Sequence, residues 1–297
     1  RYLFFTDVDL ARDLLRKVVR LNRSGKHVRV MGGRDIPFRE LTKIPFIAPS
    51  QTMGMWNKLV PPQLERKAIY NHVLFQGIPG CGKTAFCRFI APQYPKWFFI
   101  VVPPHVIGKP SDVAGMYAEA RKYRPSVLIF EDIDLIGKNR QAESAHFDQF
   151  LGALINSLDG IDPVTKVLTI ASTNNPLALD PAVVRAGRLG IHVNFSYTPK
   201  EKLDILRLYY KFPHVGDEAL LSYTKMVDTV ADLKAIAKVT QVYEEFYGQT
   251  VDENELREIV KQATAKSKFE KLPLLDGDEN EINESVPPEA VDDSYVS

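Results

Sequence analysis

The chain has 297 residues, 45% of them hydrophobic and 25% charged, so it has an ordinary globular composition and is long enough for two domains. A net charge of +1 without an arginine-rich run argues against a nucleic-acid-binding face, so we expect no nucleic-acid partner. The two cysteines exclude a disulfide framework and predict an intracellular, reducing compartment, whether cytoplasmic or organellar. No apolar run of about 18 residues occurs, so we also expect no membrane span.

The first stretch, residues 1–54, is predicted to be an N-terminal helical segment followed by a linker. Residues 7–22 have an apolar face at helical spacing and basic residues largely elsewhere. We expect this helix to pack on its own domain, although a basic amphipathic helix can also bind a membrane surface or a partner. Residues 27–31 alternate as a short strand does, and prolines punctuate residues 34–62.

Residues 55–197 alternate short apolar runs with helical patterns, which is typical of a parallel sheet covered by helices on both faces. The fold class is therefore predicted to be α/β. The five expected strands are residues 72–76, 97–102, 126–130, 166–171 and 191–195.

A phosphate-binding loop is predicted directly after the first of these strands. Residues 77–84 read Gly-Ile-Pro-Gly-Cys-Gly-Lys-Thr and fit the pattern G-x-x-x-x-G-K-[ST] at every fixed position. Glycines let the backbone wrap phosphates, and the following helix directs its positive N-terminus at them. Lys83 is predicted to reach the β- and γ-phosphates, and Thr84 to hold Mg²⁺. The predicted nucleotide-binding residues are Gly77, Ile78, Pro79, Gly80, Cys81, Gly82, Lys83, Thr84 and Ala85.

Two adjacent carboxylates, Glu131 and Asp132, follow the fully apolar strand predicted at residues 126–130. Because open parallel sheets bind ligands at the carboxyl ends of their strands, these acids should face the phosphates held by Lys83 and Thr84. One acid can join the magnesium shell, and the other can orient or deprotonate an attacking water. The alternative is that both acids only cap the strand end.

Three further polar residues are candidates for the same edge of the sheet. Asn174 follows the strand predicted at residues 166–171, and its amide could hydrogen-bond the attacking water or the γ-phosphate. Arg185 and Arg188 lie three residues apart outside the predicted strands. Guanidinium groups suit phosphate recognition, but arginine pairs are also common on protein surfaces.

Beyond residue 198 the pattern becomes helical, with helices expected at residues 200–210, 217–221, 229–247 and 252–269. Thr229 and Asp252 occupy N-cap positions, with Asp232 and Glu255 three residues later as in a capping box. Residues 198–272 are therefore predicted to be a small helical domain. Residues 273–297 are predicted to be a disordered tail, because residues 275–297 contain eight acidic residues and no basic one.

These motifs, in this order, resemble the AAA family of ATPases over about residues 55–270. Residues 77–84 are similar to its Walker A loop, 127–132 to Walker B, 173–176 (Thr-Asn-Asn-Pro) to sensor 1, and 179–188 to its L-D-P-A-x-x-R-x-G-R signature. The segment Val-Ala-Asp-Leu at 230–233 looks like the family's G-A-D-L lid segment.

The resemblance implies a P-loop nucleoside triphosphatase that uses ATP and Mg²⁺ and assembles into a ring, usually a hexamer. It implies that Thr84, Glu131 and Asp132 belong to the metal site, and that Asn174 is a catalytic residue beside the two acids. It also implies that Arg185 and Arg188 are arginine fingers that act on the γ-phosphate in the neighbouring subunit.

The chain departs from the common family pattern at the two acids. Most members read Asp-Glu in Walker B, whereas this chain reads Glu131-Asp132. By position, Glu131 would take the magnesium role and Asp132 the role of base with a shorter reach, or the two acids could exchange roles. The swapped pair also resembles the branch that contains the mitochondrial Rieske-protein translocase.

A second departure concerns residues 105–109, which read His-Val-Ile-Gly-Lys where most threading members carry an aromatic pore loop. The missing aromatic residue argues against ordinary threading of an unfolded chain. We therefore expect a chaperone-like, ring-forming ATPase that remodels, disassembles or translocates a protein client that the sequence does not identify. Two alternatives are a nucleotide-gated scaffold with weak hydrolysis and a DNA-acting relative of the same superfamily.

Overall fold

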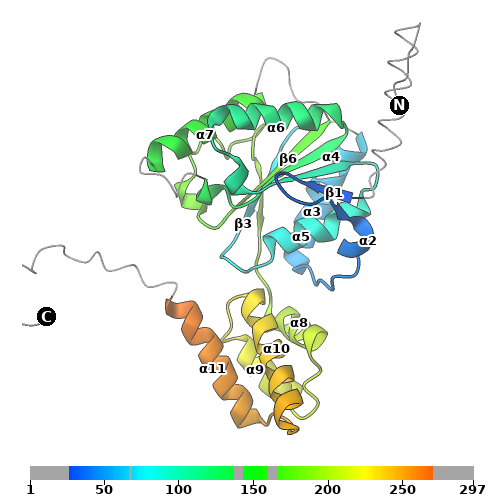
Figure 1. Cartoon of the computed structure of the whole chain (residues 1–297), viewed down its shortest axis with the longest axis vertical. Coiled ribbons are helices and arrows are strands. Elements are labelled where there is room, and N and C mark those ends of the chain that lie inside the picture. The colour runs from blue at the N-terminus through cyan, green and yellow to red at the C-terminus, as the bar shows by residue number, and fades with distance from the viewer. Residues whose placement is uncertain (1–26, 67–68, 137–142, 160–165, 270–297) are drawn as a thin grey trace, which may run out of the picture.

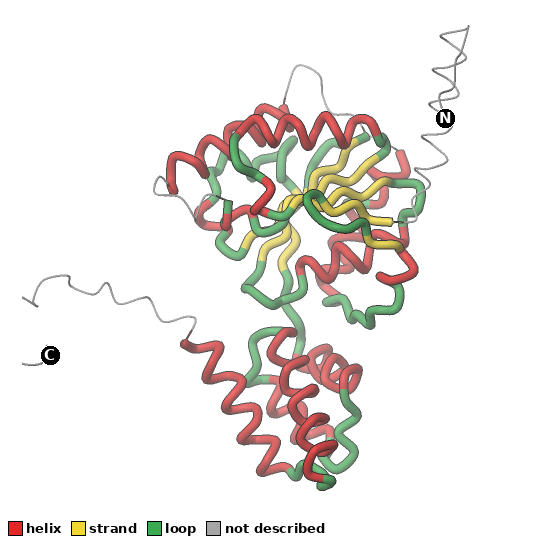
Figure 2. The backbone as a smooth tube through the Cα atoms, viewed as in Figure 1, coloured by secondary structure: helices red, strands yellow, loops and turns green. Residues whose placement is uncertain are grey.

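We describe a computed structural model of the chain over residues 27–66, 69–136, 143–159 and 166–269. The helix predicted at residues 7–22 and the acidic tail predicted at 273–297 lie outside these ranges. Figure 2 shows a larger domain that contains all the described strands and a smaller domain built from helices. No helix within the described ranges is long and apolar enough to cross a membrane.

A seven-stranded sheet forms the centre of the larger domain (Figure 1). The strand order is β2-β1-β4-β5-β6-β3-β7, and every hydrogen-bonded pair is parallel except β1 with β2. The strands are β1 (His27–Val30), β2 (Ile36–Pro37), β3 (Val73–Gln76), β4 (Phe98–Val102), β5 (Ser126–Phe130), β6 (Val167–Thr173) and β7 (Ile191–Asn194). Strands β3 to β7 are the five that the sequence predicts, so the parallel α/β fold is confirmed.

The first two strands correct the prediction that residues 1–54 form a helical segment and a linker outside the sheet domain, and they confirm the short strand indicated at residues 27–31. Strand β1 pairs in parallel with β4, with Val28 opposite Phe99, and β2 pairs with β1 on its outer side. The predicted boundary at residue 55 therefore falls inside the sheet domain. The physical reason is edge protection, because an apolar β4 without a neighbour would expose a row of unpaired backbone groups.

Helices cover both faces of the sheet, and each face has its own hydrophobic core because alternate strand residues point to opposite sides. One face carries α2 (Phe38–Leu41), α3 (Ser50–Leu59), α4 (Pro61–Arg66) and α5 (Lys83–Ile90). The other face carries α6 (Pro110–Lys122) and α7 (Glu143–Asp159), which lie side by side across it in Figure 1. Short 3-10 turns occur at Ala91–Gln93, Pro104–Val106, Ile133–Leu135 and Pro176–Ala178.

The smaller domain packs its helices around a separate core. Its helices are α8 (Pro199–Tyr209), α9 (Asp217–Thr224), α10 (Val230–Tyr247) and α11 (Glu253–Phe269). The predicted N-caps are confirmed, since the Thr229 hydroxyl accepts a hydrogen bond from the Asp232 N–H at 3.0 Å. Asp252 and Glu255 exchange both hydrogen bonds of a capping box, at 2.8 and 2.9 Å.

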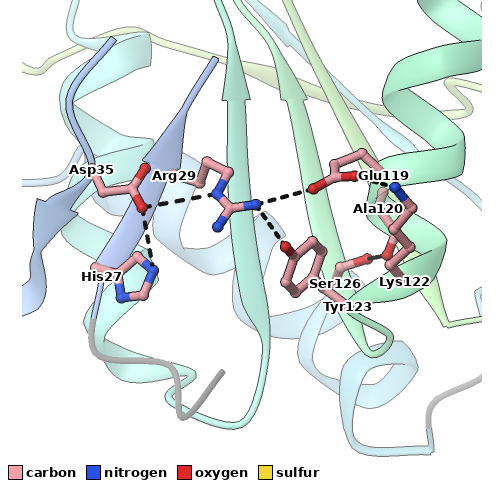
Figure 3. A network of polar contacts seen from close by, with 8 residues as sticks. All are labelled: His27, Arg29, Asp35, Glu119, Ala120, Lys122, Tyr123 and Ser126. Carbon is pink, nitrogen blue, oxygen red and sulfur yellow. Dashed lines mark hydrogen bonds and ion pairs between the residues drawn. The ribbon is translucent and has the colours of Figure 1, made fainter. Parts of the chain in front are cut away.

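A polar network fastens the added strand β1 to helix α6 (Figure 3). Arg29 Nη1 donates to Glu119 Oε1 at 3.0 Å and to the Tyr123 hydroxyl at 2.8 Å. The same guanidinium lies 4.8 Å from the Tyr123 ring centroid and 5.3 Å from that of Phe98. Asp35 approaches its Nε at 3.8 Å. Strand β1 is therefore held by charged and stacking contacts as well as by its backbone.

Candidate functional site

The predicted phosphate loop connects β3 to α5 at the carboxyl edge of the sheet. Gly80 and Gly82 have φ angles of +76° and +100°, in the left-handed region that favours glycine. A methyl group on Gly80 would lie 2.9 Å from the Ala231 Cβ, so the close approach of the helical domain also requires glycine there. Helix α5 begins after Gly82 and directs its free N–H groups at the loop.

Lys83 and Asn174 are brought together at this loop, as the sequence predicts. The Lys83 side chain is 5% exposed, and its Nζ donates to the Gly77 carbonyl at 2.7 Å. The same Nζ donates to Asn174 Oδ1 at 2.6 Å, which joins the first residue of α5 to the residue that follows β6. The phosphate loop and the neighbouring strand end therefore place a cation and an amide at one point on the sheet edge.

Glu131, the first of the two acids, faces helix α5. Its carboxylate hydrogen-bonds Thr84, the loop residue predicted to hold Mg²⁺. Burial raises the pKa of Glu131 above its usual range, while the bond to Thr84 and the positive charge of Arg88 act in the opposite direction. Glu131 and Thr84 therefore form one polar pair.

Asp132, the second acid, faces the other side of the loop. Its Oδ1 accepts a hydrogen bond from Asn174 Nδ2 at 3.4 Å. Burial raises the pKa of Asp132, and the positive charge of Lys83 opposes that rise. Its backbone has a left-handed φ of +40°, and its N–H donates to Ser172 Oγ at 2.9 Å. This conformation, which aspartate tolerates better than most residues, turns Asp132 away from the direction of Glu131.

Two residues that hold this arrangement were missed by sequence reasoning. Asp134 is 7% exposed, and its Oδ1 accepts a hydrogen bond from the Asn174 N–H at 2.9 Å. Ser172 holds the Asp132 backbone, as described above. The available signal was an acid placed two residues after Asp132 in an otherwise apolar segment, but its partner Asn174, just after β6, is 40 residues away in the sequence.

The two predicted arginine fingers lie together at the end of α7, and none of their described contacts is to the phosphate loop of their own chain. Arg188 is buried, and its Nε donates to Asp159 Oδ2 at 2.5 Å. Arg185 donates to the same oxygen at 3.3 Å, and its side chain is 61% exposed. Their positive charges hold the pKa of Asp159 below its usual range.

The start of β3 supports the turn that carries these arginines. Asn71 Oδ1 accepts a hydrogen bond from the Gly187 N–H at 2.7 Å, where Gly187 has a φ of +87°. The His72 N–H donates to the Arg188 carbonyl at 2.7 Å. Because the strand that supports this turn also leads into the phosphate loop, the two functional segments share one rigid element. The sequence indicated neither Asn71 nor Asp159.

The segment without the aromatic residue is fixed to the rest of the domain. Val106 and Ile107 are partly buried against the core under α6, together with Met31 from the end of β1. Asp112 Oδ2 accepts hydrogen bonds from the N–H groups of Gly108 and Lys109 at 2.8 and 3.0 Å. This segment is thus held by side-chain packing and by a helix cap.

The site fits a nucleoside triphosphate with Mg²⁺. Gly80 and Gly82 have left-handed backbone conformations and carry no side chains, so the loop can present its N–H groups to phosphate oxygens. In the described ranges, no group of three or more His, Cys, Asp and Glu side chains could bind a metal alone. Mg²⁺ commonly binds through one or two protein oxygens together with substrate phosphates, and Thr84 and Glu131 supply such oxygens.

Comparisons with known proteins agree with this geometry. Residues 73–197 match the family model described as ATPase family associated with various cellular activities (AAA). The chain is 38% identical over 122 residues to the ATPase family gene 2 protein of Schizosaccharomyces pombe, covering 39% of this chain and 15% of that protein. It is 33% identical over 178 residues to the 26S proteasome regulatory subunit 10B of Dictyostelium discoideum, covering 55% of this chain and 45% of that protein.

A third similar protein is the 26S proteasome regulatory subunit 10B homolog A of Arabidopsis thaliana, 31% identical over 198 residues. That match covers 63% of this chain and 47% of the relative. The chain therefore spans less than half the length of these three relatives. The matches confirm that residues 73–197 form a domain of the predicted AAA ATPase family, with the predicted α/β fold, and members of that family use ATP with Mg²⁺.

Proposed function

Because the chain carries a domain of the AAA family of ATPases, we propose that it is a ring-forming, Mg²⁺-dependent ATPase that remodels, disassembles or translocates a protein partner. The observation that carries this proposal is the convergence of Lys83, Asn174, Thr84 and the two acids on one edge of the sheet. An intracellular, reducing location and kinship with the Rieske-translocase branch remain predictions from the sequence.

The contacts of the two acids support a division of roles between them. Glu131 is paired with Thr84, so these two residues would hold Mg²⁺, which would neutralise charge on the phosphates. Asp132 lies beside Asn174 and the charge of Lys83, where it can orient a water and accept its proton as the water attacks the γ-phosphorus. The bond from the γ-phosphorus to the leaving ADP oxygen then breaks. This assignment favours the positional alignment over the exchange of roles.

Hydrolysis is proposed to need a second subunit. None of the described contacts of Arg185 and Arg188 reaches the phosphate loop of their own chain, so these side chains would serve a neighbouring site. Arginines that enter a phosphoryl-transfer site in this way raise turnover by about 10³ to 10⁵ in related enzymes. A ring in which each subunit completes the next one's site provides such neighbours.

The client is proposed to be a protein, and two observations bear on how it is handled. Two of the similar proteins are named as subunits of the 26S proteasome regulatory particle. The segment at residues 105–109 lacks an aromatic residue and is fixed by Met31 and Asp112. A fixed, non-aromatic segment suits contact with a folded partner better than gripping of an extended chain.

The second candidate function is a nucleotide-gated scaffold with weak hydrolysis. It is favoured by the short reach of Asp132, because a base that sits one methylene further back needs a bridging water. This alternative predicts the same nucleotide binding and assembly. It differs in the rate of ATP hydrolysis, which for a scaffold would not change when Arg185, Arg188 or Asp132 is substituted.

A mixing experiment tests the proposed function. One variant, Lys83→Ala, lacks nucleotide binding but keeps its arginines, and the other, Arg185→Ala with Arg188→Ala, keeps its nucleotide site. Each alone should hydrolyse ATP at a background rate. A 1:1 mixture should recover about a quarter of the native rate per subunit, because half the sites are intact and half their neighbours supply arginines. A mixture no faster than its two components would contradict catalysis across the interface.

A further inference from the structure

A cavity of about 220 Å³ lies beside the phosphate loop, and most of the residues that line it have no role in the proposed reaction. It is enclosed by helix α5 on one side and by the β1–β2 unit with α2 on the other. Its walls are mainly aliphatic side chains from β1, β4 and β5, namely Val28, Val30, Val101 and Ile129. The added strands that the sequence did not place in the sheet thus form one side of the cavity.

The size and lining of this cavity suit a small molecule. Protein interiors are close-packed, and voids larger than a water molecule are few. A dry apolar cavity of about 150 Å³ is large enough to bind benzene, so this one can hold a molecule of about eight non-hydrogen atoms. An apolar pocket with a few polar groups at one end is the usual form of a ligand site.

The polar groups of the cavity define the charge of the ligand. Arg88 lines it from α5, and its positive charge acts on the Glu131 carboxylate, but among the described contacts the two do not form an ion pair. The other lining arginine, Arg34, is already engaged by Glu40 at 3.0 and 3.3 Å. Arg88 is exposed and marks the outer end of the cavity, whereas Glu131 is half-buried and marks the inner end. The positive charge of Arg88 therefore attracts an anionic group to the outer end, and the negative charge of Glu131 repels it from the inner end.

We propose that this cavity binds a small carboxylate with an apolar tail of about five carbons, with its carboxylate on Arg88 and its tail between β1 and α5. Thr84 and Glu131 also line the cavity. The ligand and the magnesium nucleotide therefore share two residues and compete for their positions. By thermodynamic linkage, each lowers the affinity of the protein for the other by the same factor.

Binding is tested with hexanoate as the probe, by calorimetric titration into the full chain without nucleotide or Mg²⁺. Arg88→Gln should weaken hexanoate binding at least about tenfold, because a charge-assisted hydrogen bond is lost. Lys58→Gln, which removes an exposed charge on α3 outside the cavity, should leave it unchanged. Val30→Phe should abolish binding by filling the cavity, with circular dichroism confirming that the variant is folded.

The chemistry of the ligand is tested with 1-hexanol and acetate, which lack the charge and the tail respectively. Both should bind at least about tenfold more weakly than hexanoate. Saturation with Mg²⁺-ADP should lower hexanoate affinity several-fold. Equal binding of hexanoate and hexanol, or equal affinities for the native chain and Arg88→Gln, would overturn the proposal. The titration measures binding without ATP hydrolysis, so a negative result for hexanoate can be distinguished from a failure of the proposed hydrolysis.

Discussion

At the level of single residues, the two acids differ in their partners, and this difference supports their separate roles. Glu131 is bound to Thr84, whereas Asp132 faces Asn174 and is turned by a left-handed backbone. The swapped order of the acids therefore still gives one acid beside the loop threonine and one beside the amide. Substituting the acids one at a time separates the two roles.

We expect Asp132→Asn to keep nucleotide affinity and to lower kcat by about 10²- to 10⁴-fold, the usual effect of removing a general base. Glu131→Gln should instead raise the Mg²⁺ concentration needed for nucleotide binding. Both are checked by fluorescent-nucleotide titration at several Mg²⁺ concentrations beside steady-state kinetics. The reverse pattern, with Asp132→Asn as the variant that needs more Mg²⁺, would show that the acids exchange roles.

The buried His72 gives a pH-dependent stability. Burial lowers the pKa of His72 to about 4, and its Nδ1 accepts a hydrogen bond from the Thr169 N–H at 3.0 Å, so the folded state holds it neutral. The unfolded chain binds this proton near the ordinary pKa of about 6.5, so stability falls as the pH drops from about 6.5 towards 4.

Urea unfolding at pH 7 and pH 5 measures this effect. The contribution of His72 should amount to about 2 kcal/mol of stability lost over this interval. His72→Asn, whose side-chain oxygen can accept the same hydrogen bond, should remove that part of the pH dependence. If the native chain and the variant lose stability equally, His72 is not the titrating group.

Among the helices and strands, β1 is the strand whose place in the sheet the sequence did not predict. It protects the edge of β4, walls the cavity and depends on the Arg29 network (Figure 3). Arg29→Ala should lower the free energy of unfolding by about 1–2 kcal/mol, since it removes a half-exposed ion pair and stacking on two rings.

Arg29→Lys serves as the matched variant, because it keeps the charge and loses the planar hydrogen-bonding and stacking geometry. It should recover less than half of the stability lost in Arg29→Ala, as measured by urea denaturation. Full recovery with lysine would mean that charge alone holds β1.

The strands and helices that could be predicted are those whose signal is local. Strands β3 to β7 are apolar runs bounded by turn residues, and the caps at Thr229 and Asp252 depend on residues three positions away. Strand β1 has only four residues and needs β4 beside it, a pairing across 71 residues from Val28 to Phe99. Its place in the sheet therefore could not be read from its own pattern.

The residues of the candidate site also fall into those with a local sequence signal and those without one. The loop, the two acids, Asn174 and the arginines follow fixed spacings and were predicted. Asp134, Asp159 and Asn71 act through partners on other elements, at sequence separations of 40, 29 and 116 residues. A single sequence carries no signal for such pairs, because any exposed acid or amide has the same local appearance.

At the scale of the whole molecule, the helical domain touches the phosphate loop directly. The Ala231 N–H donates to the Gly80 carbonyl at 3.2 Å, at the start of α10. Nucleotide bound to the loop would therefore be sensed by both domains. Gly80→Ala should weaken this contact, because its added methyl group would lie 2.9 Å from the Ala231 side chain.

We expect Gly80→Ala to cost about 1–3 kcal/mol of stability and to weaken nucleotide binding, from the steric conflict and the left-handed backbone together. Adding Ala231→Gly should relieve the steric part alone, and nucleotide titration with thermal unfolding of the double variant measures the recovery. A double variant no better than Gly80→Ala would assign the whole effect to the backbone.

If hydrolysis is completed by a neighbouring subunit, turnover must depend on ring formation. The ATPase rate per subunit is determined over a range of protein concentrations, with light scattering on the same samples with and without ATP and Mg²⁺. We expect the rate per subunit to rise as the ring forms and to stay at background when Arg185 is replaced by alanine. A rate per subunit that is the same for monomer and ring would contradict it.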